Sequence, residues 1–201
     1  MSALMVAIAA EGPDAEIYRS LMESIIGRPI RSWTGPFAFY GCKAVAKAAP
    51  VFLGAAARAG VAHAMLAIDN DGGSKRRPEH TPFDVAPPFT IDDDDTCREC
   101  WLTQAIPSSW KATTRRHCVA VPVQTVETWL LAIRGIPPFN TRTPEQQYAR
   151  NVLKRMFYGS PLPSESRRVS IASEELTKPG ALSTLGARPS FQRFASQLAG
   201  W

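Results

Sequence analysis

The chain alternates short, continuous apolar runs with longer stretches in which apolar residues recur every three or four positions. The clearest apolar runs span residues 4–10, 62–68 and 118–123, and turn or polar residues bound each of them. A run of this kind is typical of a strand that is covered on both faces in a parallel sheet. Residues 30–40 predict irregular structure or one further short strand.

Helices are predicted where the apolar spacing is helical and turn residues begin or end the pattern. After Gly12 and Pro13, apolar side chains recur at helical spacing until Gly27, which predicts a helix between these turns. Further helices are predicted over 43–59 with an interruption near Pro50, over 92–105, over 125–134, from the capping box at 143–146 to about 158, and from a Ser190 cap to about 199. Residues 162–186 predict mostly irregular structure with a short helix around 173.

Strands that alternate with helices predict an α/β fold, a layered and largely parallel Rossmann-like sheet flanked by helices. We assign residues 1–135 to this α/β domain, with a loop and helix insertion at about 72–112. Residues 136–201 are then a helical C-terminal extension packed on the same domain.

Acidic side chains follow two of the predicted strands at the point where each strand ends. Glu11 follows the first run, and Asp69 and Asp71 follow the second. Ligands of open parallel sheets bind beyond the carboxyl ends of the strands, and neighbouring strands lie only ~4.8 Å apart. If the two strands are neighbours, their carboxylates converge and need a cation, for which Mg²⁺ or Mn²⁺ is suited. The alternative is that these acids cap a loop and a helix.

Four short motifs together resemble a known family. They are EGP at 11–13, DND at 69–71, PVQTVETWLLA at 122–132 and RPSFQRFASQL at 188–198. In this order they resemble the TOPRIM domain. They are more closely similar to a small stand-alone TOPRIM-related family found with ATPases in bacterial phage-defence loci, itself distantly similar to overcoming-lysogeny-defect nucleases. The resemblance covers most of the chain.

The resemblance implies a TOPRIM-like fold and a metal-dependent nuclease whose metal-binding core is Glu11, Asp69 and Asp71. It also implies that Glu127 is an additional acid at the same site. The alternative for Glu127 is a first-turn glutamate that stabilises a helix dipole. One position departs from the family pattern: related sequences commonly carry an acid four residues after the first glutamate, where this chain has Ala15. Asp14 or Glu16 are candidates to replace it.

The net charge of the chain indicates an anionic partner. The 201-residue chain has a formal net charge of +5 and a sequence pI of about 9.2, which favours a polyanion such as nucleic acid. Solubility alone is the other reason for such a charge. The triplet Lys75, Arg76 and Arg77 directly follows the aspartates and is a candidate to hold a phosphodiester backbone. Weaker candidates of the same kind are Arg115, Arg116, Arg167 and Arg168.

Four cysteines in a chain of this length do not predict a disulfide scaffold. Cys97 and Cys100 form one Cys-x-x-Cys, and structural Zn²⁺ would need two more ligands from His80, His117 or Cys118. Buried structural cysteines explain the same spacing without a metal. No secretory signal opens the chain and no apolar run spans a bilayer, so we expect a cytoplasmic protein without membrane contact.

The leading hypothesis is a Mg²⁺- or Mn²⁺-dependent nuclease that cuts DNA or RNA, with catalytic residues Glu11, Asp69, Asp71 and Glu127. A second hypothesis is a non-catalytic nucleic-acid-binding or regulatory subunit of a defence complex, with a degenerate site. A third, a phosphatase with an aspartyl nucleophile, fits less well because such enzymes place the nucleophile where this chain has Glu11.

The partner implied by the resemblance is an ATPase subunit from the same locus, since the sequence contains no phosphate-binding loop motif of its own. The chain is also a candidate homo-oligomer. Phe191, Phe194 and Trp201, on or beside the last predicted helix, either form a docking surface for a partner or close the core.

Overall fold

The computed structural model describes residues 2–69, 98–122, 125–136 and 152–201. The sheet contains four strands, which are β1 (Leu4–Ala9), β2 (Ile30–Trp33), β3 (His63–Ala67) and β4 (Arg116–Ala120). Their order is β2-β1-β3-β4, and every neighbouring pair is parallel. The predicted α/β fold with a parallel sheet flanked by helices is therefore confirmed.

Strand β1 lies between β2 and β3, so the two clearest apolar runs of the sequence are direct neighbours. Val6 pairs with His63, and His63 pairs in turn with Arg116 of β4. Because all pairs are parallel, the carboxyl ends of β1, β3 and β4 meet at one edge of the sheet, and their amino ends meet at the opposite edge. These two edges are called the carboxyl edge and the amino edge below.

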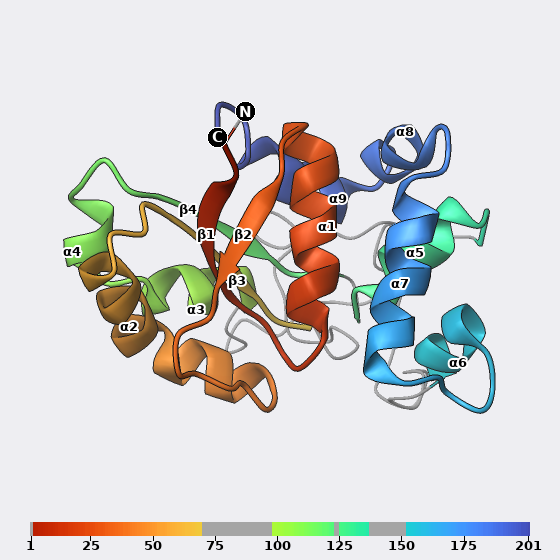
Figure 1. The fold of residues 1–201 in the computed structure, drawn as a ribbon, viewed down its shortest axis with the longest axis horizontal. Helices are drawn as coiled ribbons and strands as arrows, with labels where there is room; N and C mark the ends of the chain where they lie inside the picture. The colour runs from red at the N-terminus through yellow and green to blue at the C-terminus, as the bar shows by residue number, and fades with distance from the viewer. Residues whose placement is uncertain (1, 70–97, 123–124, 137–151) are drawn as a thin grey trace, which may run out of the picture.

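Helices cover both faces of the sheet and form two separate hydrophobic cores (Figure 1). One face is covered by α1 (Asp14–Ile26), and the other by α2 (Cys42–Arg58), α3 (Arg98–Ala105) and α4 (Ser108–Lys111). Along β1, Val6 and Ile8 belong to the core on the α1 side, whereas Ala7 and Ala9 belong to the core on the α2 side. Burial on both faces explains why the strand is apolar at every position.

The C-terminal helices pack on the α1 side of the sheet and join the same core. They are α5 (Glu127–Ile133), α6 (Val152–Tyr158), α7 (Glu165–Leu176), α8 (Ala181–Gly186) and α9 (Pro189–Ser196). Arg134, directly after α5, links α6 and α7. Its Nε donates to Glu175 Oε1 at 2.8 Å, and its guanidinium lies 4.0 Å from the centre of the Phe157 ring.

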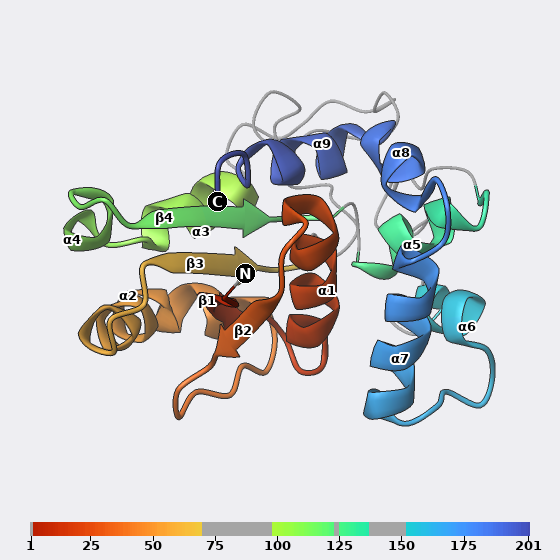
Figure 2. The same cartoon turned by 45° about the horizontal axis from the view of Figure 1, so that its top comes forward.

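The end of the chain covers the edge strand β4 (Figure 2). The Gln197 side chain pairs with the backbone of Val119 in both directions, since Oε1 accepts from the Val119 N–H at 2.9 Å and Nε2 donates to its carbonyl at 3.0 Å. These bonds satisfy backbone groups that an edge strand otherwise leaves open. None of the helices among the described residues is long and apolar enough to cross a membrane.

The prediction of mostly irregular structure over 162–186 is wrong, although the short helix predicted around 173 is present as part of a longer helix. Helix α7 begins after Ser164, whose hydroxyl accepts from the Arg167 N–H, and α8 follows after Gly180. The apolar positions of α7 are sparse, because only a narrow stripe that includes Val169, Ala172 and Leu176 meets the core. Packing against α1 and α5, rather than a strong amphipathic pattern, stabilises this helix.

Two local predictions about helix ends also need correction. Helix α2 continues through Pro50 without interruption, because buried Ala49 and Phe52 hold it against the sheet on both sides of the proline. Ser190 lies inside α9 rather than at its cap, which is Arg188. Its hydroxyl instead accepts a hydrogen bond from the indole of Trp129 at 2.9 Å.

The aromatic side chains of α9 close the core. Phe191 and Phe194 are 2% and 1% exposed and pack against Trp129. Of the two roles left open by the sequence, the structure supports the second for these rings, because neither is available to a partner. Trp201 is half-buried and packs beside His63.

Candidate functional site

Two of the predicted acids converge at the carboxyl edge of the sheet. Glu11 follows β1 and Asp69 follows β3, and both line one small pocket together with Asp14 and Tyr18. The pocket has a volume of about 10 Å³, which is room for about one water molecule. Asp71 and the triplet Lys75, Arg76 and Arg77 lie outside the described residues, so their place at this edge stays a prediction.

Asp14, the first residue of α1, is an acid that the predicted ligand set left out. It is only 4% exposed, and its Oδ1 has no hydrogen-bond partner among the described residues. Burial, followed by the nearby charges of Glu127 and Glu11, raises the pKa of this carboxyl from 3.8 to about 7, against the opposing effect of Lys154 and Arg168. A buried carboxylate in such surroundings either keeps its proton or needs a cation.

Glu127, at the start of α5, does not line the pocket but lies within electrostatic reach of Asp14. Its side chain is fully buried, and neither carboxylate oxygen has a hydrogen-bond partner among the described residues. A glutamate that only stabilises a helix dipole is commonly exposed, whereas this one is desolvated beside another acid. The burial favours the role as an additional acid at the site over the dipole role.

The C-terminal helices supply the basic and hydroxyl groups around these acids. Lys154 on α6 and Arg168 on α7 act on Asp14 as positive charges. The Tyr158 hydroxyl is buried and faces Glu127 without a hydrogen bond of normal geometry; burial first, and then Glu127 and Asp14, raise the pKa of Tyr158 above its usual range. The guanidinium of Arg168 lies 6.0 Å from the centre of the Tyr158 ring.

The structure also distinguishes between the two candidates for the acid that Ala15 replaces. Ala15 packs partly buried against the core. Glu16 forms an ion pair with Arg19 at 2.7 Å on the surface of α1, whereas Asp14 lines the pocket. Asp14 is thus the substitute that the geometry allows. The sequence signal for this role was that Asp14 lies one residue before Ala15, the position where related sequences carry the acid.

The donor set fits a hard divalent cation. Glu11, Asp14, Asp69 and Glu127 offer only oxygen ligands, and Mg²⁺ keeps several waters when it binds through a few carboxylates. The orphaned oxygens of Asp14 and Glu127 are the observation that supports this fit. Within the described ranges, no group of three or more His, Cys, Asp or Glu side chains is already close enough together to hold a metal ion.

The other candidates from the sequence lie elsewhere. Cys118 is buried in the sheet, where desolvation raises the pKa of its thiol, and Cys100 is half-buried on α3. Cys97 and His80 lie outside the described residues, so the zinc site stays a prediction. Arg167 is exposed and forms a 3.3 Å ion pair with Glu174 on α7.

Comparison with protein-family models, curated proteins and solved structures gives no match to this chain. The similarity to the TOPRIM domain therefore stays a prediction from the four motifs. The function proposed below therefore rests on the geometry of the site and on these motifs.

Proposed function

We propose that the protein is a divalent-metal-dependent nuclease that hydrolyses phosphodiester bonds of DNA or RNA. The observation that carries the proposal is the convergence of Glu11 and Asp69 on one pocket, with buried Asp14 beside them and Glu127 within electrostatic reach. Buried carboxylate oxygens without a hydrogen-bond partner among the described residues, such as those of Asp14 and Glu127, are costly unless a cation compensates them. The resemblance to TOPRIM nucleases supports the same assignment.

Glu11, Asp69 and Asp71 would hold Mg²⁺ or Mn²⁺, which would polarise the phosphate and stabilise charge on its oxygens. The chain's own groups have separate tasks. Asp14 would add a carboxylate ligand to the same ion, because a bound cation offsets the burial that raises the pKa of Asp14 in the metal-free protein. Lys154 and Arg168 place positive charge beside the acids, where the substrate phosphate would lie. Lys75, Arg76 and Arg77 are the proposed contacts to the neighbouring backbone.

The family resemblance also supports a proposal about where the protein acts and which partner controls it. We place the protein in the cytoplasm, in bacterial anti-phage defence, with an ATPase subunit from the same locus as its regulator. A nuclease without control would damage its own host, so we expect the isolated chain to be weakly active. Co-purification with the neighbouring ATPase, followed by nuclease assays of the complex, would test this part.

Replacing Asp69 by Asn should abolish metal-dependent cleavage, with a loss of about a hundredfold or more, because the substitution removes a charged ligand that no neighbour can replace. The measurement is cleavage of labelled single- and double-stranded DNA and RNA with Mg²⁺ or Mn²⁺, with and without the ATPase. Glu16→Gln is the matched control, since Glu16 is an acid of the same segment whose side chain pairs with Arg19.

The same series decides between the two leading hypotheses. If wild type and Asp69→Asn are equally inactive on every nucleic acid, alone and with the partner, the nuclease proposal fails. Retained nucleic-acid binding in that case would favour a regulatory subunit with a degenerate site. If wild type and Asp69→Asn cleave nucleic acid equally well, the residues that catalyse cleavage lie outside this pocket.

A further inference from the structure

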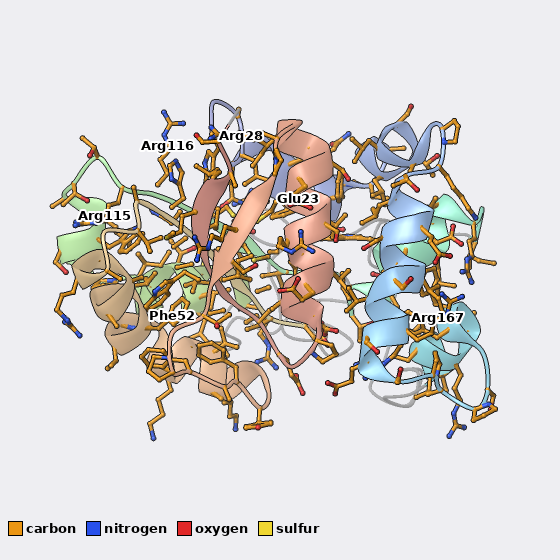
Figure 3. All side chains as sticks on the ribbon, in the orientation of Figure 1. Glu23, Arg28, Phe52, Arg115, Arg116 and Arg167 are labelled. Atoms are coloured by element: carbon orange, nitrogen blue, oxygen red, sulfur yellow. The ribbon has the colours of Figure 1, made fainter. Side chains whose placement is uncertain are left out.

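Basic side chains gather at the amino edge of the sheet, opposite the acidic pocket. They come from the segments that enter β2, β3 and β4 and from the first residues of these strands. We call this group the amino-edge patch; its members are Arg28, Arg31, Arg58, Lys111, Arg115 and Arg116. Figure 3 shows Arg28, Arg115 and Arg116 on the side of the molecule where the strands begin, far from Arg167.

Several members of the patch lie close together around the starts of β3 and β4. His63 at the start of β3 is half-buried, and its pKa is lowered by burial and then by the charges of Arg116 and Arg28. His63 pairs in register with Arg116, and the pKa of His117 is lowered by burial and by Lys111. Arg28, which precedes β2, and Arg116 of β4 therefore both lie within electrostatic reach of His63 on β3.

Glu23 lies beside the patch, since its Oε1 accepts from the Ile30 N–H between Arg28 and Arg31 at 2.7 Å, but its ion pair is with Arg19. The segments 27–31, 58–63 and 111–117 contain no Asp or Glu, and none of the six basic side chains forms an ion pair within the described part of the chain. Arg28 and Arg116 instead donate to the backbone carbonyls of Ser2 at 3.0 Å and Gly200 at 2.7 Å. Arg31 and Arg58 are exposed.

Helix dipoles account for only part of this arrangement. Arg58 lies in the last turn of α2, where a cation stabilises the helix end, and Arg28 follows α1 closely. Arg31 and Arg116, however, are residues of strands, where no helix terminus attracts a positive charge. The surplus of charge at this edge is therefore available for an external anion.

We infer that the amino-edge patch binds the phosphate backbone of a nucleic acid without reading its sequence. Five of its six basic groups are arginines, whose planar guanidinium matches phosphate oxygens in a forked geometry. Mutually repelling cations spread over several strands suit a ligand with regularly repeated negative charges. This surface would bind whether or not the acidic pocket cleaves, so the inference does not rest on the proposed function.

The two edges are separated by the length of the sheet. Strand β1 has 6 residues, which at ~3.3 Å per residue gives about 20 Å between the patch and the pocket. A nucleic acid that reaches both must therefore extend over about six nucleotides at 3.4 Å each. Oligonucleotides shorter than this should not benefit from the patch when they occupy the pocket.

Charge reversal with a matched control tests the inference. Arg31→Glu and Arg58→Glu each reverse one exposed member of the patch. The control is Arg167→Glu on α7, far from the patch; the sequence made Arg167 a weak candidate for phosphate binding, but in the structure its guanidinium already pairs with Glu174. Binding of labelled DNA and RNA is measured by fluorescence anisotropy over a range of salt concentrations. Chelator is present throughout, so that cleavage cannot contribute. Circular dichroism melts establish that each variant is folded.

We expect each patch variant to bind several-fold more weakly, and the Arg31→Glu Arg58→Glu double variant about tenfold more weakly at ~0.1 M salt, with a salt slope reduced by about one per lost contact. Arg167→Glu should change the affinity little. Equal losses in patch and control variants, or no salt-dependent binding by wild type, would overturn the inference. So would tighter binding of polyglutamate than of nucleic acid with the same dependence on Arg31, because that result identifies an acidic protein as the partner.

Discussion

Replacing Trp129 by Ala should lower the free energy of unfolding by about 3–5 kcal/mol, as expected for the loss of a fully buried indole. Trp129 is 0% exposed and lies where α5, α1 and α9 meet. Its ring packs edge-on against Tyr18 at 6.3 Å and Phe191 at 5.3 Å, and stacks on Phe194 at 5.6 Å. No neighbouring side chain can fill the resulting cavity without moving one of these rings.

Urea unfolding followed by far-UV circular dichroism measures this effect. Ser190→Ala is the matched control, because it removes only the hydroxyl that accepts from the Trp129 indole at 2.9 Å. That change should cost about 1–3 kcal/mol, since it leaves a buried N–H without a partner. A Trp129→Ala loss no larger than that of Ser190→Ala would contradict the central position of the indole in this core.

The central strands β1 and β3 were predictable because nearly all of their residues are apolar and buried. Alternate positions of β1 enter different cores, so the strand has no polar face and the apolar run is unmistakable. The full length of α7 and the presence of α8 were not predictable, because α7 depends on packing against α1 and α5, and α8 on packing against α5 and α9, rather than on their own sequence. Ser190 was misassigned for a related reason: a serine before an apolar pattern predicts a cap, while its actual partner is 61 positions away in the sequence.

The candidate site was predictable to the extent that it follows from strand ends. Glu11 and Asp69 follow neighbouring parallel strands, so the topology alone brings them together. The burial of Glu127 could not be predicted, because a glutamate in the first turn of a helix is usually exposed. The contribution of Lys154 and Arg168 depends on how α6 and α7 pack on the α/β domain, which no local pattern determines.

Replacing Asp14 by Asn should stabilise the metal-free protein above neutral pH by up to about 4 kcal/mol, the free energy that corresponds to a pKa shift of about three units. The pKa of Asp14 is raised from 3.8 to about 7 in the folded state. The folded protein therefore binds this proton more tightly than the unfolded chain does. The stability that the folded protein gains from binding this proton is fully present below about pH 4 and is lost as the pH rises through about 7. The neutral amide of Asn avoids that loss.

Chemical denaturation of wild type and Asp14→Asn in chelator, from about pH 4 to about pH 8, measures the difference, which should grow with pH. Glu16→Gln, which removes an acid at the surface of the same helix, should show no such growth. A difference that is constant with pH would mean that Asp14 ionises normally in the folded protein.

Saturating Mg²⁺ should stabilise wild type more than Asp14→Asn, by about 2.7 kcal/mol at a hundredfold excess over the dissociation constant if the variant no longer binds. Asp14 would then cost stability without the metal and recover it when the metal binds, as expected for an acid retained for function rather than for folding.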